Sequence, residues 1–423
     1  MKYFIHTTGC KANQWDSHAI SGKLHKAGFS RGALSQADIV IINACTLTQG
    51  AERDIRRFIN HCRSVNKGSK IVLAGCHAQV YPDNAFGADV ILGQEEKFLI
   101  EYLLTDEGVY VKKTRDFSTK DEEPNHLMYG RTRFFLKIQD GCDRFCSYCV
   151  VPYARGKPRS KPVEEVLKIL KVLKDKKVRE VVLTGIEIAS YSDMKTGADL
   201  KKLLVLLAES ATPERIRLSS VDPLYIDDEF IDIISGAEKI AKSLHIPLQS
   251  GCDRVLEKMG RGYSGEYMRG IISKLKRKIN NIGIGLDVIA GFPTEDEGAF
   301  METYRFLESV DIYYLHVFPY SARPGTAAFS LGGDIPEYVK KERVRILRRL
   351  DTAKREAYHR RFLDSEAIIV PEGKCYKGLY MRGYTDNYLP VYVPFKKSLE
   401  NQFIRVRIKE LKDNVLFGEP AKT

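Results

Sequence analysis

Three cysteines fall close together in the segment GCDRFCSYC, where Cys142, Cys146 and Cys149 have CxxxCxxC spacing. They follow the strand-like run RFFLKIQ, so we expect them on a loop at the carboxyl-terminal mouth of a barrel, where active sites gather. Thiolates hold iron-sulfur clusters, and three cysteines leave one iron of a four-iron cluster without a protein ligand. S-adenosylmethionine (SAM) can chelate that iron through its amino and carboxylate groups. The triad therefore predicts a [4Fe-4S] cluster that reduces SAM to a 5′-deoxyadenosyl radical.

Structural zinc is the alternative for this triad, but zinc usually takes four ligands from two paired CxxC elements, and the chain has no second CxxC.

A second triad lies near the amino terminus, where Cys10, Cys45 and Cys76 each close a strand-like run: HTTGC, INAC and LAGC. Ligands of open α/β sheets gather beyond the carboxyl ends of the strands, so these thiols can converge. They predict a second [4Fe-4S] cluster with an open iron. The alternative is three buried thiols in an α/β core. We interpret the remaining cysteines as ordinary residues.

The pattern around the triads predicts an α/β protein of three domains. Residues 1–108 alternate apolar runs with helical stretches, as in an open parallel sheet, and the polar stretch 109–130 is typical of a linker. Residues 131–360 carry six strand-helix units, which favours a partial (β/α)6 barrel. Residues 361–423 change to short β runs with Gly and Pro, as in a small β-barrel.

Composition narrows the class of partner. Of 423 residues, 43% are hydrophobic and 29% charged, as in a soluble globular protein, and no apolar run is long enough to span a membrane. We therefore expect a cytoplasmic protein without a membrane partner. The formal charge of +12 favours a polyanion, nucleic acid first.

The chain resembles the radical SAM methylthiotransferase family over essentially its full length. The resemblance rests on TTGCKANQWDS, NACTLT, LAGCHAQ, KIQDGCDRFCSYCVVPYARGKPRS, IPLQSGCDRVLEKMGRGYS and FPYSARPGTAA. It implies a radical SAM barrel between an amino-terminal cluster domain and a carboxyl-terminal TRAM domain. The cysteine segment most resembles enzymes that methylthiolate threonylcarbamoyl-adenosine beside the tRNA anticodon.

The resemblance also implies contacts to SAM. Gly185 and Glu187 stand where a glycine-rich motif meets the methionine end of SAM, and Glu187 would accept hydrogen bonds from its ammonium group. Ile186 replaces the usual second glycine, and helix capping is the alternative for Glu187. Polar or small residues at later strand ends would contact the ribose or adenine of SAM, unless they only stabilise loops; these are Ser220, Asp222, Gln249, Asp287 and Gly291. Tyr148, the aromatic residue inside the cysteine loop, would lie against SAM.

Three arginines are candidates for substrate binding, because guanidinium groups suit both phosphates and carboxylates. Arg155 and Arg159 follow the cysteine loop, and Arg323 lies in SARPGT; solvated surface is the alternative. The basic segment 340–361 predicts a phosphate-binding helix, with a solvated helix face as the alternative. Basic residues interleaved with tyrosines in the last domain favour RNA, and the alternative is that some of these tyrosines fill the core of the small barrel.

Together these features predict sulfur insertion and methyl transfer at carbon 2 of threonylcarbamoyl-adenosine in a tRNA anticodon stem-loop. General acid-base chemistry does not reach an aryl hydrogen, so the cofactors must carry the reaction. Electrons would come from flavodoxin or ferredoxin and its reductase. Isopentenyl-adenosine in tRNA and an aspartate of a ribosomal protein are alternative substrates, and a two-cluster electron carrier is the alternative class.

Overall fold

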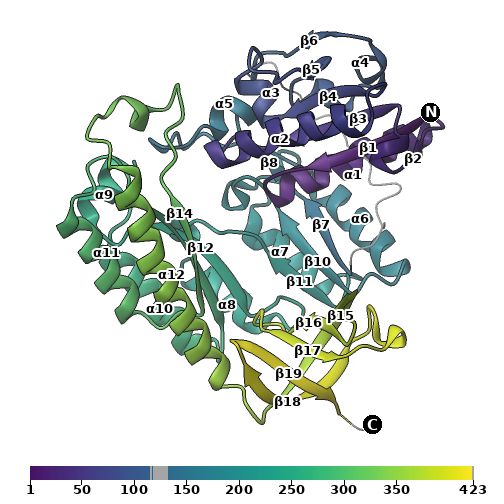
Figure 1. Cartoon of the computed structure of the whole chain (residues 1–423). Helices are drawn as coiled ribbons and strands as arrows, with labels where there is room; N and C mark the ends of the chain where they lie inside the picture. Colours follow the sequence, from purple (N-terminus) through teal and green to yellow (C-terminus); the bar gives the residue numbers. More distant parts are fainter. Residues whose placement is uncertain (115–116, 118–131, 422–423) are drawn as a thin grey trace.

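The computed structural model describes residues 1–114, 117 and 132–421. Three parts follow one another along the chain, and Figure 1 shows the first above, the largest in the middle and the last below. Among the described residues, no helix combines the length and apolar character needed to cross a membrane.

The first part is a parallel sheet of six strands in the order β2-β1-β3-β4-β5-β6. Its helices α1 and α2 begin right after β1 and β3, so the strand ends lead directly into helix starts (Figure 1). The elements are β1 Lys2–Thr7, α1 Lys11–Lys26, β2 Ser30–Arg31, β3 Ile39–Ala44, α2 Gln49–Val65, β4 Lys70–Gly75, α3 Cys76–Val80, β5 Val90–Leu92, α4 Ile100–Leu104 and β6 Gly108–Tyr110.

Strand β6 carries this sheet to Tyr110, just past the boundary expected at residue 108. Most of the linker expected at 109–130 lies outside the described residues.

The middle part has the six expected strands, divided into two parallel sheets of three, β11-β10-β7 and β12-β13-β14. An isolated bridge between Ile216 and Ile240, and a hydrogen bond from Val221 N to His245 O (3.0 Å), join the two sheets. The strands are β7 Arg133–Lys137, β10 Glu180–Thr184, β11 Arg215–Leu218, β12 Ser243–Gln249, β13 Gly283–Ala290 and β14 Tyr314–Pro319, and a short hairpin pairs β8 Gln139–Asp140 with β9 Arg159–Ser160. The partial α/β barrel is therefore confirmed.

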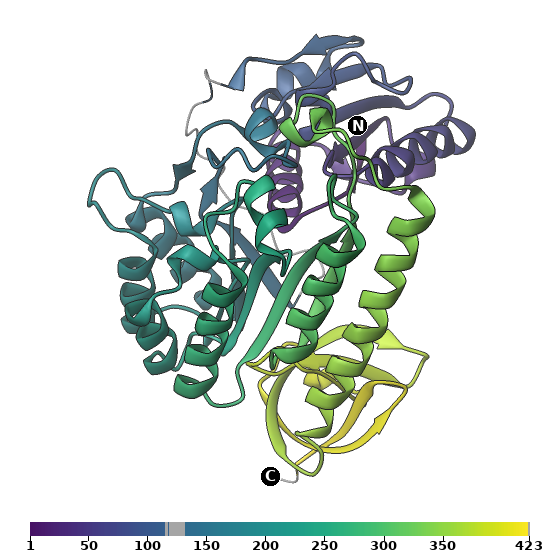
Figure 2. The same cartoon turned by 90° about the vertical axis from the view of Figure 1, so that its left-hand side faces the viewer.

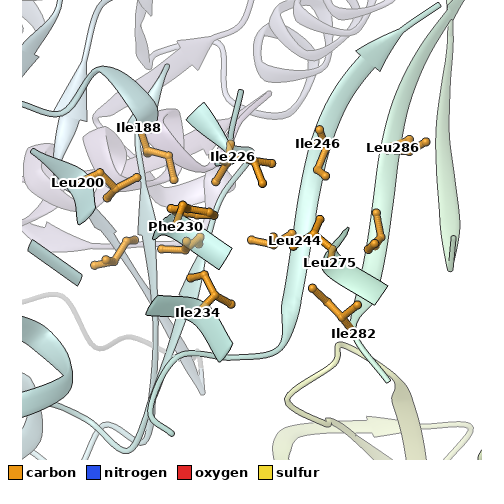
Figure 3. Close-up of a cluster of buried hydrophobic side chains, with 14 of the residues drawn as sticks. Ile188, Leu200, Ile226, Phe230, Ile234, Leu244, Ile246, Leu275, Ile282 and Leu286 are labelled. Atoms are coloured by element: carbon orange, nitrogen blue, oxygen red, sulfur yellow. The ribbon is translucent and has the colours of Figure 1, made fainter. Parts of the chain in front are cut away.

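Helices cover the outer face of this barrel (Figure 2). The helices of the middle part are α5 Val151–Arg155, α6 Val163–Asp175, α7 Leu200–Glu209, α8 Asp228–Gly236, α9 Asp253–Lys258, α10 Gly265–Lys278, α11 Glu297–Ser309 and α12 Glu337–Arg360. The short α5 does not belong to the outer layer, because it lies against α3 of the first domain (Figure 1). Leu244 and Ile246 of β12 point toward Phe230 of α8 and Leu275 of α10 in a fully buried layer (Figure 3). Since β12 alternates, its other side chains, such as His245, face the barrel interior.

The last part is a closed barrel of five strands in the order β15-β16-β17-β19-β18. Buried Ile369, Met381, Val391, Val406 and Leu416 fill it. Its strands are β15 Glu366–Tyr376, β16 Tyr380–Tyr384, β17 Pro390–Pro394, β18 Ile404–Lys412 and β19 Val415–Pro420. The expected small β-barrel is confirmed, and α12 leads into it from the partial α/β barrel (Figure 2).

Candidate active site: two cysteine triads at one domain interface

The loop of the first triad is held in place by its backbone. Cys142 N–H donates to Gly156 O (2.9 Å), and Ser147 N–H donates to Met259 O (3.0 Å). Gly141, with φ 79°, precedes the triad, and a Cβ there would lie 2.0 Å from Lys157 O. The neighbouring turn approaches so closely that only glycine fits. The loop therefore presents its three thiols in a fixed arrangement at the mouth of the partial α/β barrel.

All three thiols are free and partly buried. Burial raises the pKa of Cys142, and it raises that of Cys149 to about 12, so these groups are protonated until a metal displaces the proton. The guanidinium of Arg261 lies 3.3 Å from the Cys146 sulfur. Sequence reasoning did not single out Arg261, although it belongs to the quoted segment GRGYS.

The second triad lies where expected, beyond the carboxyl ends of β1, β3 and β4. Cys45 N–H donates to Thr8 Oγ1 (2.9 Å), and the Gln94 amide donates to the Cys76 sulfur (3.0 Å). A Cβ on Gly9, where φ is 91°, would lie 2.9 Å from the Cys45 sulfur, so Gly9 leaves room for that thiol. Burial raises the pKa of Cys10, and it raises that of Cys45 to about 12.

Both triads fit an iron-sulfur cluster better than a single ion. Among the described residues, only His245, Asp287 and His316 form a set of His, Cys, Asp or Glu side chains whose ligand atoms all lie within 4.8 Å of one another. Neither cysteine triad meets this limit, so the three sulfur atoms of each triad are farther apart. Zinc-sulfur bonds of about 2.3 Å would draw thiolates closer together than that. A cluster takes one thiolate on each of three irons, which suits the wider spacing.

Charged side chains surround the mouth of the partial barrel beside the first triad. Arg144 contacts Glu187 (3.5 Å) and Asp222 (2.7 Å), and Arg261 also contacts Asp222 (2.8 Å). Burial, followed by the charge of Asp222, raises the pKa of Glu187 to about 7. A carboxylate so poorly solvated is suited to an ammonium ligand.

Gln139, the first residue of β8, orders the turn that carries Glu187. Its Oε1 accepts from Ile186 N–H (3.1 Å) and Glu187 N–H (2.9 Å). A Cβ on Gly185 would lie 2.9 Å from this Oε1, which explains the glycine. The side chain of Glu187 also accepts from Ala189 N–H (3.3 Å), so capping and ligand binding coexist at this residue.

Three other residues expected to contact SAM lie outside the charged group around Glu187. Tyr148 packs against a buried cluster that includes Met259 and Phe292. Gln249 is buried at the end of β12, with φ 70°. Ser220 follows β11 and is partly buried.

Asp287 and Gly291 already have partners within the protein. The Asp287 carboxylate lies 2.7 Å from His245 Nε2 and 3.4 Å from His316 Nδ1, and Gly291 N–H donates to Glu295 (2.5 Å). The pKa of Asp287 lies below its ordinary value, because the two histidines outweigh the effect of burial.

A buried ionic network joins the first domain to the partial barrel. The Asp16 carboxylate of α1 binds Lys97 (2.7 Å), Lys137 of β7 (2.5 Å) and Arg155 of α5 (2.9 Å). Arg155 also binds Asp140 (2.9 Å). Burial alone would raise the pKa of Asp16, but the three cations hold it well below its usual range.

This network corrects the role expected for Arg155. Its side chain is 1% exposed, and its terminal nitrogen atoms bind Asp16, Asp140 and the Asn13 amide oxygen, so it does not meet a tRNA phosphate. It instead positions the triads, because α5 begins two residues after Cys149 and lies against α3, which begins at Cys76.

Arg323 has a similar place at the last barrel loop. It is 2% exposed, donates to Thr46 Oγ1 (2.9 Å), forms an ion pair with Glu52 and stacks over Tyr81 (4.9 Å). It therefore joins the loop after β14 to the first domain and is not open to substrate. Arg159, which is partly exposed, donates to the carbonyl oxygens of Arg155 (3.0 Å) and Lys157 (2.9 Å).

Helix α12 carries a basic pocket of about 450 Å³. Its lining combines four cations with a few neutral residues, namely Lys341, Arg345, Arg348, Arg349, Pro319, Val344 and Thr352. A second cavity of about 250 Å³, between β14, α12 and the five-stranded barrel, is lined mainly by tyrosines and arginines. The tyrosines that we expected to stack on RNA therefore have two kinds of position. Tyr384, Tyr388 and Tyr392 line this cavity, whereas Tyr380 packs on Phe417.

Comparison with known proteins agrees with this geometry. The model of the radical SAM superfamily matches residues 136–307, and that of uncharacterized protein family UPF0004 matches residues 2–93. The fold also resembles the radical SAM methyltransferase TsrM from Kitasatospora setae, with a TM-score of 0.56 at 14% identity over 77% of this chain and 76% of that one. The central domain is therefore that of a radical SAM enzyme.

Full-length relatives narrow the class. The chain is 38% identical to the threonylcarbamoyladenosine tRNA methylthiotransferase MtaB of Aquifex aeolicus (92% of this chain, 96% of the relative) and 35% identical to that of Bacillus subtilis (96% and 93%). It is 30% identical to a tRNA-2-methylthio-N(6)-dimethylallyladenosine synthase of Thermotoga petrophila (99% and 97%). The chain belongs to the radical SAM methylthiotransferase family, whose enzymes use SAM and two [4Fe-4S] clusters.

Proposed function

We propose that this protein transfers a methylthio group to carbon 2 of threonylcarbamoyl-adenosine beside the anticodon of tRNA. The observation that carries the proposal is the placement of two triads of free thiols on contacting elements of two domains joined by the Asp16 network. Relatives named for threonylcarbamoyladenosine are 33–38% identical to this chain, whereas relatives named for dimethylallyladenosine are 29–32% identical, which favours the first substrate.

The two triads have different roles in this proposal. Cys142, Cys146 and Cys149 would hold the cluster that binds SAM, and Cys10, Cys45 and Cys76 the cluster that carries the sulfur. These groups supply the radical and the sulfur when bound, and the remaining work falls to side chains.

The residues at the barrel mouth would bind and orient SAM. The Glu187 carboxylate would accept hydrogen bonds from the SAM ammonium group, with Gln139 keeping its turn in place. Arg261 would stabilise negative charge on the Cys146 thiolate, since its guanidinium already lies 3.3 Å from that sulfur. Gln249, Ser220 and Tyr148 would complete the SAM site.

The tRNA would contact the basic pocket of α12 and the five-stranded barrel, which we propose to be a TRAM domain. Arg345, Arg348 and Arg349 line one side of that pocket, and phosphate binding by such cations is strongly dependent on salt. Reduction of the clusters would need an electron donor of the flavodoxin or ferredoxin type, with its reductase, in the cytoplasm.

Nucleoside mass spectrometry of tRNA from a strain lacking this gene tests the proposal. We expect loss of 2-methylthio-threonylcarbamoyl-adenosine alone, restored by the wild-type gene and not by a Cys146→Ser variant. Loss of the methylthio group from isopentenyl-adenosine would assign the alternative substrate. An unchanged tRNA profile would refute the proposal and direct the search to a ribosomal protein.

A further inference from the structure

Three neighbouring strands of the partial barrel each direct a polar side chain into its interior. On β12, β13 and β14, the residues on either side of His245, Asp287 and His316 are buried in the outer core. Since side chains alternate along a strand, these three face the opposite, inner side. The strands form one parallel sheet, and Asp287 pairs directly with His316. The sheet therefore brings two imidazoles and one carboxylate together inside the barrel.

The spacing of these side chains suits a single metal ion. Their ligand atoms all lie within 4.8 Å of one another. Oδ1 of Asp287 is 2.7 Å from His245 Nε2 and 3.4 Å from His316 Nδ1. Metal bonds of about 2.1 Å at octahedral or tetrahedral angles hold two ligand atoms about 3.0–3.4 Å apart. Small movements of the side chains would therefore be enough to bind a cation.

The ring of His245 is oriented by a hydrogen-bond partner on its other nitrogen. Its Nδ1 lies 3.0 Å from the hydroxyl group of Tyr314, a buried residue of β14. A Cβ on Gly285 would lie 2.1 Å from the Tyr314 ring, so glycine on β13 makes room for this tyrosine. Metal-binding histidines almost always have such a partner, which fixes the ring and leaves the second nitrogen for the metal.

One side of this cluster is open to a cavity. The His316 side chain is 50% exposed and lines the cavity of about 250 Å³ between β14, α12 and the five-stranded barrel. Arg355 and Arg382 line the same cavity. A cation with three protein ligands keeps coordination positions for other ligands, as catalytic metal sites do. Here water or an anionic oxygen ligand could reach those positions through the cavity.

A hydrogen-bonded cluster without a metal is the alternative for these three residues. It accounts for the contact between His245 and Asp287, since 2.7 Å is an ordinary hydrogen-bond length. It accounts poorly for His316, because a separation of 3.4 Å is long for a charge-assisted hydrogen bond. The same separation is typical of two ligands of one metal ion, so the metal site explains both distances.

We propose that His245, Asp287 and His316 bind one divalent transition-metal ion inside the partial barrel. Two imidazoles and a carboxylate suit Mn²⁺, Fe²⁺ or Zn²⁺, whereas Ca²⁺ and Mg²⁺ prefer oxygen ligands alone. Each ligand lies three or four residues before the end of its strand, so the site is roughly 10 Å below the barrel mouth that carries the first cysteine triad. The ion is therefore separate from both clusters, and its binding does not depend on which adenosine is the substrate.

Binding of Mn²⁺ to the cluster-loaded protein tests the proposal. Mn²⁺ prefers nitrogen and oxygen ligands to thiolates. Its sharp EPR signal in solution is lost on binding, and oxidised [4Fe-4S] clusters add no signal of their own. We expect the wild type to bind one Mn²⁺ per chain. His316→Gln and Asp287→Asn should each weaken binding by more than about tenfold, and Tyr314→Phe by roughly tenfold, because loss of a ligand's hydrogen-bond partner alone typically costs about 10–100-fold.

His61→Gln serves as the matched control, because His61 is exposed on α2 of the first domain, and this variant should bind Mn²⁺ as the wild type does. Iron content and Trp15 emission will show that each variant keeps its clusters and its fold. A wild type that binds no Mn²⁺ would overturn the inference, as would folded His316→Gln and Asp287→Asn proteins with wild-type affinity. The tRNA nucleoside profile tests the proposed function separately, so the two can fail independently.

Discussion

Replacing Asp16 by asparagine should weaken the contact between the first domain and the partial barrel. The carboxylate is fully buried and lies 2.5–2.9 Å from Lys97, Lys137 and Arg155. At an effective dielectric constant of about 20, each contact supplies roughly 6 kcal/mol of attraction before desolvation is subtracted. Because the variant leaves three cations with Asp140 as their remaining carboxylate in the network, we expect a net loss of about 3–5 kcal/mol.

Trp15 makes this loss measurable. It is the single tryptophan of the chain, it is fully buried beside Asp16, and its ring meets Phe134 of β7 edge to face at 5.9 Å. Its emission therefore reports the contact between the two domains. With a urea dependence of about 2 kcal/mol per molar, the midpoint of the emission change should fall by roughly 2 M.

Two further variants sharpen this test. Glu342→Gln removes an exposed ion pair with Arg345 and should leave the midpoint unchanged, since surface pairs contribute about 0–1 kcal/mol. Lys137→Met should lower it, and the double variant with Asp16→Asn should lower it by less than the sum. An Asp16→Asn midpoint within about 0.3 M of the wild type would show that the network does not join the domains.

Three other results are expected. Burial raises the pKa of Glu187 to about 7, so protonation of this carboxylate should weaken SAM binding about eightfold when the pH falls from 7.5 to 6, as calorimetry would measure. The Glu187→Gln variant should bind SAM weakly at every pH while keeping its full iron content. An affinity equal to that of the wild type would remove Glu187 from the SAM site. The Cys146→Ser variant should lose about half of the bound iron and should no longer release 5′-deoxyadenosine from SAM. The Cys45→Ser variant should lose a similar amount of iron but still release 5′-deoxyadenosine. Equal behaviour of the two variants would contradict two separate clusters. Burial lowers the pKa of His359 from 6.5 to about 4, so on acidification the unfolded chain binds a proton at a higher pH than the folded protein does. The free energy of unfolding should therefore fall by up to about 3 kcal/mol as the pH drops from 6.5 to 4. A His359→Gln variant whose thermal stability depends on pH as in the wild type would exclude His359 as the source of this loss.

The cysteine triads could be predicted from sequence because their signals are local. Each thiol of the first domain directly follows an apolar run, and the other three share one short segment, so spacing alone places them at strand ends. The succession of apolar runs and helical stretches likewise predicted the two α/β folds, and the short β runs with Gly and Pro predicted the small barrel.

The roles of the arginines could not be predicted, since their partners are distant along the chain. Arg155 binds Asp16, and Arg323 binds Glu52, across 139 and 271 residues. An arginine that joins domains has the same local sequence as one on a solvated surface.

The first domain is fastened to the partial barrel at two ends, through Arg155 after the first strand and Arg323 after the last. A cap attached on both sides does not swing open to admit a nucleic acid. The adenosine must therefore leave its own stack and rotate into the enzyme, as bases do in enzymes that modify them. The cost of unstacking, a few kcal/mol, then falls on the RNA, so a loose anticodon loop is a better substrate than a rigid duplex of the same sequence.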